Sequence, residues 1–463
     1  MQNAMQQQTV TRMTVAELNA RIDRLPTWGL SKMVFVVVGL AYFFAFYDIS
    51  AIAFTLPELS TLFHLSGNQI AYPVTANLLG YLIGAYALGN IADYLGRRQA
   101  LLLTVIVLAI GGLLTAMSWG LWSLSIFRFI TGLGMGAEIA LAATIVTEFS
   151  PSRLRGRYTQ VNYCWGAVGL AVTPFVAVAL LNLGNPAVGW RFVFGFGALV
   201  AIMLAFMRGQ WLPESPRWLV IHGRAADAEA LVTDMEARCR AMTGQELPAI
   251  PHVPAEESYH GFPTMALFKP PYLGRMIIIF GFWSLWYVTV YGYLGFEPTI
   301  LIKKGASIPS GLLYSALGDL AIPIGAVIAL LLVDLVRRNY YMAAVAVIFA
   351  IALAVMALSS GGVTLFLGAF FSAMMIAANS VGYVYTAELF PTRARATATS
   401  IGDGMGHIGG VVAPFIVTAS LASLGGNGTL WLLAVFVLVS GAIILLGGIR
   451  IRTNYAGLTE IAS

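Results

Sequence analysis

A few ionisable side chains of this sequence stand inside long apolar runs. They are Asp48, Arg128, Glu138, Asp319 and His407. A charged group in an apolar environment costs several kcal/mol unless it is paired or hydrated. Such groups are therefore the residues whose chemistry is most informative: they can bind or transfer a proton, or hold a polar ligand.

Asp48 and Arg128 are the first pair to consider. At a rise of about 1.5 Å per residue, Asp48 lies roughly 22 Å from one start of its helix and Arg128 roughly 10 Å from the opposite side. In a layer about 30 Å thick these depths nearly coincide, so an ion pair is geometrically possible. We expect Asp48 to take up a proton and Arg128 to keep it ionised until substrate or conformation separates them. The alternative is a permanent structural pair.

His407 and Asp403 are four residues apart and share one helix face. Such a pair on a cavity helix can bind substrate or a proton, although a buried histidine can also be a hydrogen-bonded packing residue. Asp319 lies near the middle of its run with no evident partner and is a further candidate for substrate binding. Glu138 is either a second proton site or a residue capped by its neighbours.

The elements that position these residues are apolar helices. Of the 463 residues, 59% are hydrophobic and 10% are charged, too few charges to cover a water-exposed surface. We expect an all-α membrane protein with twelve spans: 33–54, 70–91, 100–117, 121–146, 158–181, 190–211, 276–296, 312–333, 341–358, 363–387, 398–421 and 430–449.

The polar segments divide the chain into two sets of six spans. We expect a cytoplasmic N-terminal segment, a six-helix bundle, a cytoplasmic linker with short helices, a second six-helix bundle and a cytoplasmic tail, over 1–32, 33–212, 213–272, 273–449 and 450–463. Thr14 and Glu17 predict a capping box at the start of a short helix. The two cysteines predict no disulfide framework or metal site, and the first span is expected to direct insertion.

The distribution of basic residues predicts the orientation. Of 26 lysines and arginines, Arg191, Lys303 and Lys304 fall on one side and Arg128 lies within the membrane, which leaves 22 on the side of both termini. That side is expected to be cytoplasmic, in the cell membrane. These loop charges explain the net charge of +5 without a nucleic-acid partner.

The second half of the sequence repeats the first. TEFSPSRLR at 147–155 is answered by AELFPTRAR at 387–395, and Pro57 by Pro298. Parallel repeats of this kind are a building plan of secondary transporters, which place the substrate site between the halves at mid-membrane.

A loop motif, GNIADYLGRR at 89–98, lies between the second and third spans. Its glycines allow a tight turn, and its acid can pair with arginines. It is either a topology anchor or a charge latch that holds one conformation. Candidate latch residues at the cytoplasmic helix ends of both halves are Gly89, Asp93, Gly96, Arg97, Arg98, Glu148, Arg153, Arg155, Arg157, Asp334, Arg338, Glu388, Arg393 and Arg395.

These motifs, together with PESPRWL at 213–219, GWR at 189–191 and FYDISAI around Asp48, resemble the major facilitator superfamily. The similarity is to the branch of sugar porters and metabolite–proton symporters. Three features differ from sugar porters. Tyr163 stands where they carry a sugar-binding glutamine, the seventh span GFWSLWYVTVYGYLGFEPTIL lacks their glutamine-rich QLSG-type stretch, and the PETKG ending is absent. The eleventh span around His407 looks more like the organic-ion and metabolite branch.

The resemblance implies two six-helix bundles that rock about a central cavity faced by the fifth and seventh spans. Candidates for its walls are Asn162, Tyr163, Trp165, Trp286 and Tyr287, although most membrane aromatics serve packing or interface anchoring. We expect the glycines at 132, 134 and 136 to serve close helix packing.

We therefore expect a secondary active transporter, with proton-coupled symport of a small organic metabolite, an organic anion or a sugar-like molecule. The alternatives are proton-driven efflux of amphipathic compounds and a non-transporting nutrient sensor. The expected partners are a small-molecule substrate, protons and membrane lipid, and the chain is expected to be a monomer. We find no nucleophile–base pair, metal spacing or nucleotide loop, so we expect no enzyme activity and no cofactor.

Overall fold

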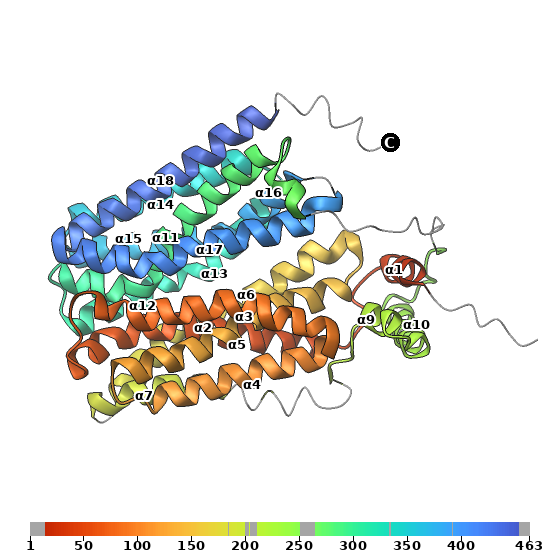
Figure 1. The fold of residues 1–463 in the computed structure, drawn as a ribbon, viewed down its shortest axis with the longest axis horizontal. Coiled ribbons are helices and arrows are strands. Elements are labelled where there is room, and N and C mark those ends of the chain that lie inside the picture. Colours follow the sequence, from red (N-terminus) through yellow and green to blue (C-terminus); the bar gives the residue numbers. More distant parts are fainter. Residues whose placement is uncertain are drawn as a thin grey trace, which may run out of the picture.

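The computed structural model describes residues 14–183, 185–199, 203, 211–250, 264–332, 335–390 and 392–452, and these are almost entirely helical. Two bundles of long helices lie side by side (Figure 1). The N-terminal bundle holds α2 to α7 and the C-terminal bundle α11 to α18. The predicted fold class, an all-α membrane protein with two pseudo-symmetric bundles, is confirmed.

Among the described residues, the N-terminal bundle has six helices: α2 (Lys32–Leu62), α3 (Tyr72–Leu95), α4 (Arg97–Ala116), α5 (Leu121–Glu148), α6 (Arg155–Leu181) and α7 (Pro186–Gly197). Short 3-10 turns η1 (Gly67–Ile70) and η2 (Ser152–Leu154) stand between them. The sixth predicted span, 190–211, begins in α7 and continues into residues outside the described part of the chain.

The C-terminal bundle consists of eight helices: α11 (Leu273–Lys303), α12 (Ile308–Asp319), α13 (Ala321–Leu332), α14 (Arg338–Leu358), α15 (Gly362–Ala378), α16 (Ser380–Glu388), α17 (Thr392–Ser423) and α18 (Gly425–Arg452). The predicted eighth span, 312–333, is thus two helices that meet at Leu320, and the predicted tenth, 363–387, is two that meet at Asn379. In the eighth span Pro323 cannot donate to the carbonyl of Asp319, which accounts for the break.

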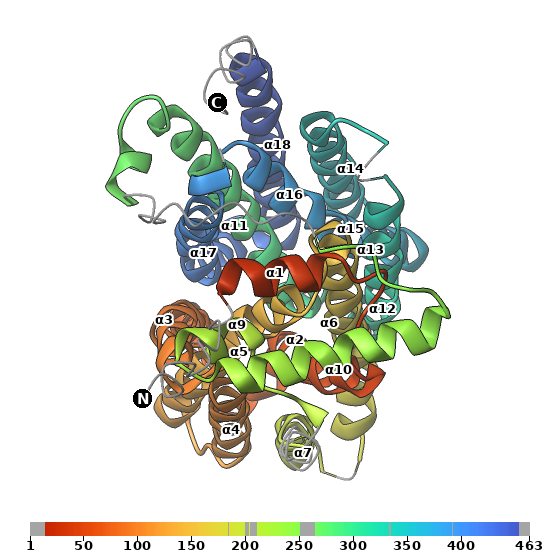
Figure 2. The same ribbon diagram turned by 90° about the vertical axis from the view of Figure 1, so that its right-hand side faces the viewer.

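Three short helices lie across one end of the bundles: α1 (Val15–Asp23), α9 (Pro216–Ile221) and α10 (Ala225–Thr243), with the turn η4 (Thr264–Phe268) leading into α11 (Figure 2). We call this the α10 end and the opposite one the far end. The predicted capping box of α1 is present, because the Glu17 amide donates to Thr14 and the Thr14 amide to Glu17.

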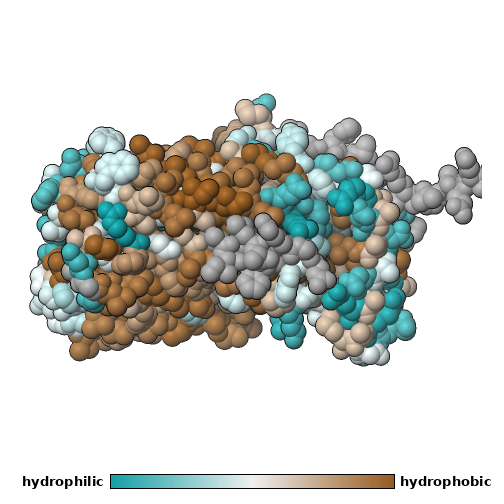
Figure 3. All heavy atoms as spheres, turned by 90° about the horizontal axis from the view of Figure 1, so that it is seen from below, coloured by the Kyte–Doolittle hydropathy of each residue, from teal (hydrophilic) through white to brown (hydrophobic). Residues whose placement is uncertain are grey.

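Eleven helical segments of the described residues are long and apolar enough to cross a membrane. Apolar side chains cover the middle of the surface, and polar ones gather at its two ends (Figure 3). Many large apolar side chains point outward, among them Leu331, Val363 and Leu446. Such a surface fits lipid and not water, as the composition predicted.

Glycines set the closest helix contact of the N-terminal bundle. A Cβ at Gly132 would meet the Asn77 carbonyl oxygen at 2.1 Å, and one at Gly136 the Tyr81 carbonyl oxygen at 2.0 Å. Gly134 packs in the same way against the backbone of Leu108 on α4. The predicted packing role of these glycines is confirmed.

The two bundles contact each other through α3 with α17, α2 with α11, and α6 with α12 and α13. Among the described residues, two hydrogen bonds cross between the bundles. The Thr75 hydroxyl donates to the Val411 carbonyl at 3.3 Å, and Thr418 to the Asn68 amide oxygen at 3.4 Å. Asn68 belongs to η1 at the far end, so these bonds hold the far half of the interface.

Candidate functional site

Asp48 of α2 and Arg128 of α5 form a buried ion pair. Arg128 Nη1 donates to Asp48 Oδ1 at 2.8 Å, and the Arg128 side chain has no exposed surface. The Arg128 guanidinium lies over the Phe194 ring, and the Asn77 amide donates to the Arg128 carbonyl at 3.0 Å. Asp48 Oδ2 and Arg128 Nε have no hydrogen-bond partner in the described part of the chain. The predicted pairing is present; its role in coupling stays a prediction.

A second polar group lies on three helices of the C-terminal bundle. The Tyr287 hydroxyl of α11 donates to Asp403 Oδ1 of α17 at 2.5 Å. The hydroxyls of Tyr383 and Tyr287 lie 2.7 Å apart. Because the single Tyr287 proton goes to the carboxylate, Tyr383 must donate to Tyr287. Three side chains thus form one directed chain that ends at Asp403.

His407 extends this group by one helical turn. Its Nδ1 lies 2.9 Å from the Asp403 carbonyl oxygen, which can only accept, so Nδ1 carries a proton. In neutral His407, Nε2 therefore accepts from the Tyr291 hydroxyl at 3.1 Å. Asp403 Oδ1 is also 3.6 Å from Nδ1, so a second proton on the ring would be compensated by a nearby carboxylate.

The N-terminal bundle closes this group from the other side. The Tyr81 ring of α3 stacks on the His407 imidazole, with centroids 4.7 Å apart and planes 20° apart. The central cluster, defined as Tyr81, Tyr287, Tyr291, Tyr383, Asp403 and His407, therefore joins both bundles. It offers four tyrosine hydroxyls, an imidazole, a carboxylate and aromatic faces, which suits a small planar ligand with polar groups at its edge.

The residues that were predicted to line the cavity lie in different parts of the structure. Tyr163 of α6 packs edge-on against Phe46 and borders the apolar contact between α6 and α13. Trp165 lies against Gly39 of α2. Asn162 is buried, and its Oδ1 has no partner in the described part of the chain.

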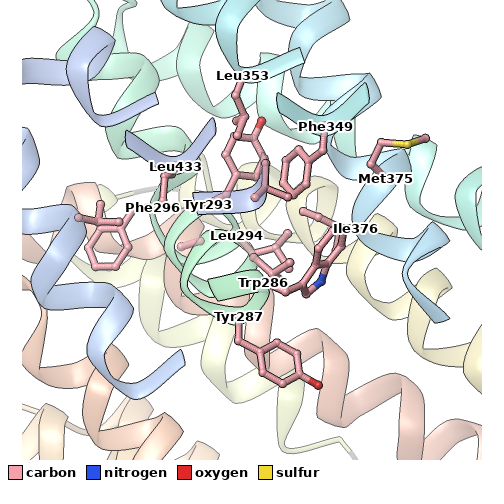
Figure 4. Packing of buried hydrophobic residues seen from close by; sticks show 14 of the residues in the cluster. Trp286, Tyr287, Tyr293, Leu294, Phe296, Phe349, Leu353, Met375, Ile376 and Leu433 are labelled. Atoms are coloured by element: carbon pink, nitrogen blue, oxygen red, sulfur yellow. The ribbon is translucent and has the colours of Figure 1, made fainter. Parts of the chain in front are cut away.

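Trp286 is placed away from the central cluster. Its indole packs in the core of the C-terminal bundle near Phe282 and Phe349, while Tyr287 points in a different direction (Figure 4). Consecutive residues of a helix face directions about 100° apart, so only one of these two can reach the cluster. Trp286 therefore lies outside the central cluster, and its expected role in substrate binding stays a prediction.

Glu138 of α5 is fully buried, and neither carboxyl oxygen has a hydrogen-bond partner in the described residues. It lies within electrostatic range of Tyr42 and Tyr81, which places it behind the central cluster in the N-terminal bundle. No capping neighbour satisfies it there. The expected cap by neighbouring residues is thus absent from the described part of the chain, and the role of Glu138 as a second proton site stays a prediction.

The loop motif forms a charge network at the α10 end. Arg97 contacts Asp93 at 2.6 Å and Glu148 at 3.2 Å. Glu214, which follows the sixth predicted span, accepts from the backbone amide of Arg97 at 2.7 Å. Gly96 has a φ of +94° and leaves no space for a Cβ beside Glu214, so this turn requires glycine.

The other latch candidates contribute less to this network. Arg153 and Arg155 donate to the backbone carbonyls of Leu25 and Thr147. In the second copy Arg338 contacts Glu388 at 3.3 Å. Gly89, Arg98 and Arg157 are exposed or only partly buried. Asp334 and the side chains of Arg393 and Arg395 lie outside the described part.

Sequence reasoning missed Tyr81, Tyr383, Glu214 and Glu297. The two tyrosines lie in apolar spans, where nothing in the pattern separates a cavity aromatic from a packing one. Glu214 stands in the PESPRWL motif, and Glu297 is an acid deep in an apolar run beside Pro298. A systematic count of acids within spans would have found Glu297.

Comparison with known proteins decides the family. The family model described as "Sugar (and other) transporter" matches residues 32–452. This chain belongs to the sugar (and other) transporter family. It is similar to the niacin transporter NiaP of Acinetobacter baylyi, with 28% identity over 93% of this chain and 97% of the relative. The 4-hydroxybenzoate transporter PcaK of the same organism is 26% identical over 95% of each chain.

Among solved structures, a D-xylose-proton symporter matches with a TM-score of 0.71 at 19% identity, over 89% of this chain and 96% of the symporter. This likeness supports the fold. This member of the family is thus a multi-pass membrane transporter of the major facilitator superfamily and not an enzyme, as the motifs predicted.

Proposed function

We propose that this transporter is a proton-coupled symporter of a small organic anion, an aromatic carboxylate in the first place. One observation carries the coupling: Asp48, a buried acid, is balanced by a single cation, Arg128. If the two separate, an ionised carboxylate in an apolar bundle is strongly disfavoured and takes up a proton. The free oxygen Oδ2 is already available for it.

The central cluster supports the substrate class. A bound carboxylate can accept the protons that Tyr291 and Tyr383 give to His407 and Tyr287 in this conformation, and the Tyr81 face can stack on a planar ring. Asp403 opposes an anion unless it is protonated or stays bonded to Tyr287. Two similar proteins are a niacin transporter and a 4-hydroxybenzoate transporter, and both of these compounds are aromatic carboxylates.

The transport geometry follows from the interface. Hydrogen bonds between Thr75 and Val411 and between Asn68 and Thr418 hold the far half of the bundles together. We assign the α10 end, which carries most basic residues, to the cytoplasm, with both termini there and the protein in the cell membrane. The described conformation then has its external side closed, and rocking of the bundles opens it.

The test uses protein reconstituted in liposomes. An inward proton gradient is expected to drive accumulation of radiolabelled niacin or 4-hydroxybenzoate, and a protonophore to abolish it. Asp48→Asn is expected to lose accumulation but keep substrate exchange, whereas Glu58→Gln, a change on the same helix, leaves both intact. Accumulation that survives the protonophore in native protein contradicts proton coupling. Transport of organic cations in place of carboxylates contradicts the substrate class and assigns Asp403 as their partner.

A further inference from the structure

Glu297 of α11 and Asp319 of α12 lie inside the C-terminal bundle, apart from the central cluster. Each is only 2% exposed. The pair interacts electrostatically, yet Glu297 Oε1 and Asp319 Oδ1 accept no hydrogen bond from the described residues. Glu297 stands six residues before the end of α11, which places it about 9 Å from the far end.

The immediate surroundings supply hydroxyls and no positive charge. Ser315 and Tyr293 lie close to the Glu297 carboxyl, and Ser372 lies close to Tyr293. Ser315 and Ser372 are completely buried, and their Oγ atoms have no partner in the described part of the chain. Farther out the shell is apolar, with Phe349 and Leu353 near Tyr293 (Figure 4).

The titratable groups that act on the pair are few. Within the described residues they are the two carboxyls themselves and Tyr293, all on α11 and α12, whereas α14 and α15 contribute Phe349, Met356 and Ser372. Lys304 follows α11, but its ammonium group donates to the Ala357 carbonyl and to Asn427. No described cation therefore compensates the pair, in contrast to Asp48 with Arg128.

The break in the eighth span adds negative potential. Asp319 is the last residue of α12, where the helix dipole is negative, and Pro323 cannot donate to the Asp319 carbonyl. Broken membrane helices place such free carbonyls at cation and proton sites. Two ionised carboxylates at this position would be mutually destabilising, so the pair must hold a positive ion.

The internal repeat shows that the fold does not require acids here. The offset of 241 residues relates Glu297 to Leu56 and Asp319 to Leu78, and both leucines are buried in the N-terminal bundle. Leucine therefore fits the corresponding positions of the same architecture. Only the C-terminal half carries acids at these two positions, and packing of the fold does not require them.

We propose that Glu297 and Asp319 form a dicarboxyl site that keeps one proton shared between them and carries a second proton during transport, in addition to the proton of Asp48. The second proton is taken from water and forms an O–H bond with the ionised carboxylate of the pair. When the bundles rock, that O–H bond breaks and the proton returns to water on the opposite side, so the pair alternates between one proton and two. A proton fits better than a metal cation, because it passes along hydroxyls such as those of Tyr293 and Ser315 without opening the apolar shell. This inference deepens the proposed function and rests on it for the transport experiment below.

The first test needs no substrate. Infrared spectra of the purified transporter at neutral pH are expected to show a protonated-carboxyl band that shifts in frequency in Glu297→Gln and in Asp319→Asn, because the remaining acid keeps a proton without its carboxyl neighbour, and that is lost in the double variant Glu297→Gln with Asp319→Asn. Asp48→Asn is expected to leave that band in place. A band that neither variant changes overturns the proposal. A band that is lost when sodium replaces choline at constant pH also overturns it, because the site then binds a metal cation.

The second test measures protons per substrate in proteoliposomes. Native protein is expected to take up twice as many protons per substrate as Glu297→Gln, while Asp48→Asn loses gradient-driven accumulation. An unchanged ratio in Glu297→Gln overturns the second site but leaves the proposed function intact. Absence of proton uptake in native protein contradicts the proposed function itself. If a polar variant fails to fold, the double variant Glu297→Leu with Asp319→Leu replaces it, because leucine occupies both equivalent positions of the first half.

Discussion

Arg128 Nη1 lies 2.8 Å from Asp48 Oδ1, although the two residues are 80 positions apart in the chain. The number of residues from each helix end places Asp48 and Arg128 at the same depth in the membrane. The packing of α2 against α5 then brings the two side chains into contact. The pair is sealed from water by the α2 and α5 helices and by the Phe194 ring. Its charge balance is therefore internal, and in the proposed coupling a proton replaces the Arg128 charge when the two groups separate.

Removing the Arg128 charge is expected to trap the protonated carboxyl. In Arg128→Gln, Asp48 loses its cation and becomes protonated, so proton release fails and the accumulation ratio falls to about 1. The measurement is gradient-driven uptake against substrate exchange at equal concentrations. Arg191→Gln, an arginine of α7 that binds the backbone carbonyls of Ala116 and Ser118, is the control and keeps accumulation. Full accumulation by Arg128→Gln would show that the pair is structural.

The Tyr81–His407 stack is expected to contribute to substrate affinity. Tyr81→Ala removes the aromatic face and weakens binding of an aromatic carboxylate about fivefold to tenfold, the effect of losing one aromatic pair. Tyr81→Phe keeps the ring and binds within about twofold of native protein. Isothermal titration or thermal shift at graded ligand concentrations measures both variants. Equal losses in Ala and Phe variants would indicate that the hydroxyl, and not the ring, matters.

Loss of the Tyr291–His407 hydrogen bond is expected to change the pH dependence of binding. Tyr291→Phe leaves Nε2 of His407 without its partner, which costs affinity of about tenfold if the ligand depends on that orientation. Affinity measured at several pH values then shows whether the His407 imidazole binds a proton during substrate binding or only positions the ligand. A variant that shifts affinity equally at every pH shows that His407 only positions the ligand.

Added volume at Gly136 is expected to destabilise the N-terminal bundle. A methyl group there meets the Tyr81 carbonyl oxygen at 2.0 Å, so α3 and α5 must separate, at a cost of about 1–3 kcal/mol. Thermal unfolding in detergent measures this as a lower Tm for Gly136→Ala. Gly195→Ala on α7 adds a methyl group in open space and is expected to leave Tm unchanged or raise it. A Tm of Gly136→Ala at or above the native value would contradict the close packing.

The contact between α1 and α10 is expected to weaken in acid. Burial acts to raise the pKa of Glu236, but hydrogen bonds from Arg21 and Arg24 prevail and lower it below its usual value. A carboxyl whose pKa is lowered in the folded state stabilises the folded protein fully at pH values above its unfolded pKa of about 4.3. This stabilisation is lost as the pH falls through the folded pKa.

Hydrogen exchange of α1 and α10 measures that effect. Glu236→Gln is expected to speed exchange at neutral pH and to match native protein in acid, below the folded pKa. Asp234→Asn removes the exposed pair with Arg238 and is the control, with little change at either pH. A difference between Glu236→Gln and native protein that persists unchanged into acid would assign the effect to packing.

The amino-acid sequence by itself determined the class, the number of halves and several pairings. Few charges and long apolar runs require lipid as the solvent, and the repeat from Glu148 to Glu388 shows one unit used twice. Helical periodicity placed Asp403 and His407 on one face and Asp48 level with Arg128, because spacing along a helix converts directly into direction and depth. The latch acid Asp93 and its Arg97 partner follow from the same local rule.

The tertiary structure decided which side chains meet across helices. Trp286 and Tyr287 are neighbours in the chain, yet one fills the C-terminal core and the other reaches Asp403. Tyr81 reaches His407 from the opposite bundle, and the fold buries Glu297 of α11 and Asp319 of α12 within the C-terminal bundle. In a span that is apolar on every face, periodicity carries no signal for rotation about the helix axis, so only packing against other helices determines which face looks inward.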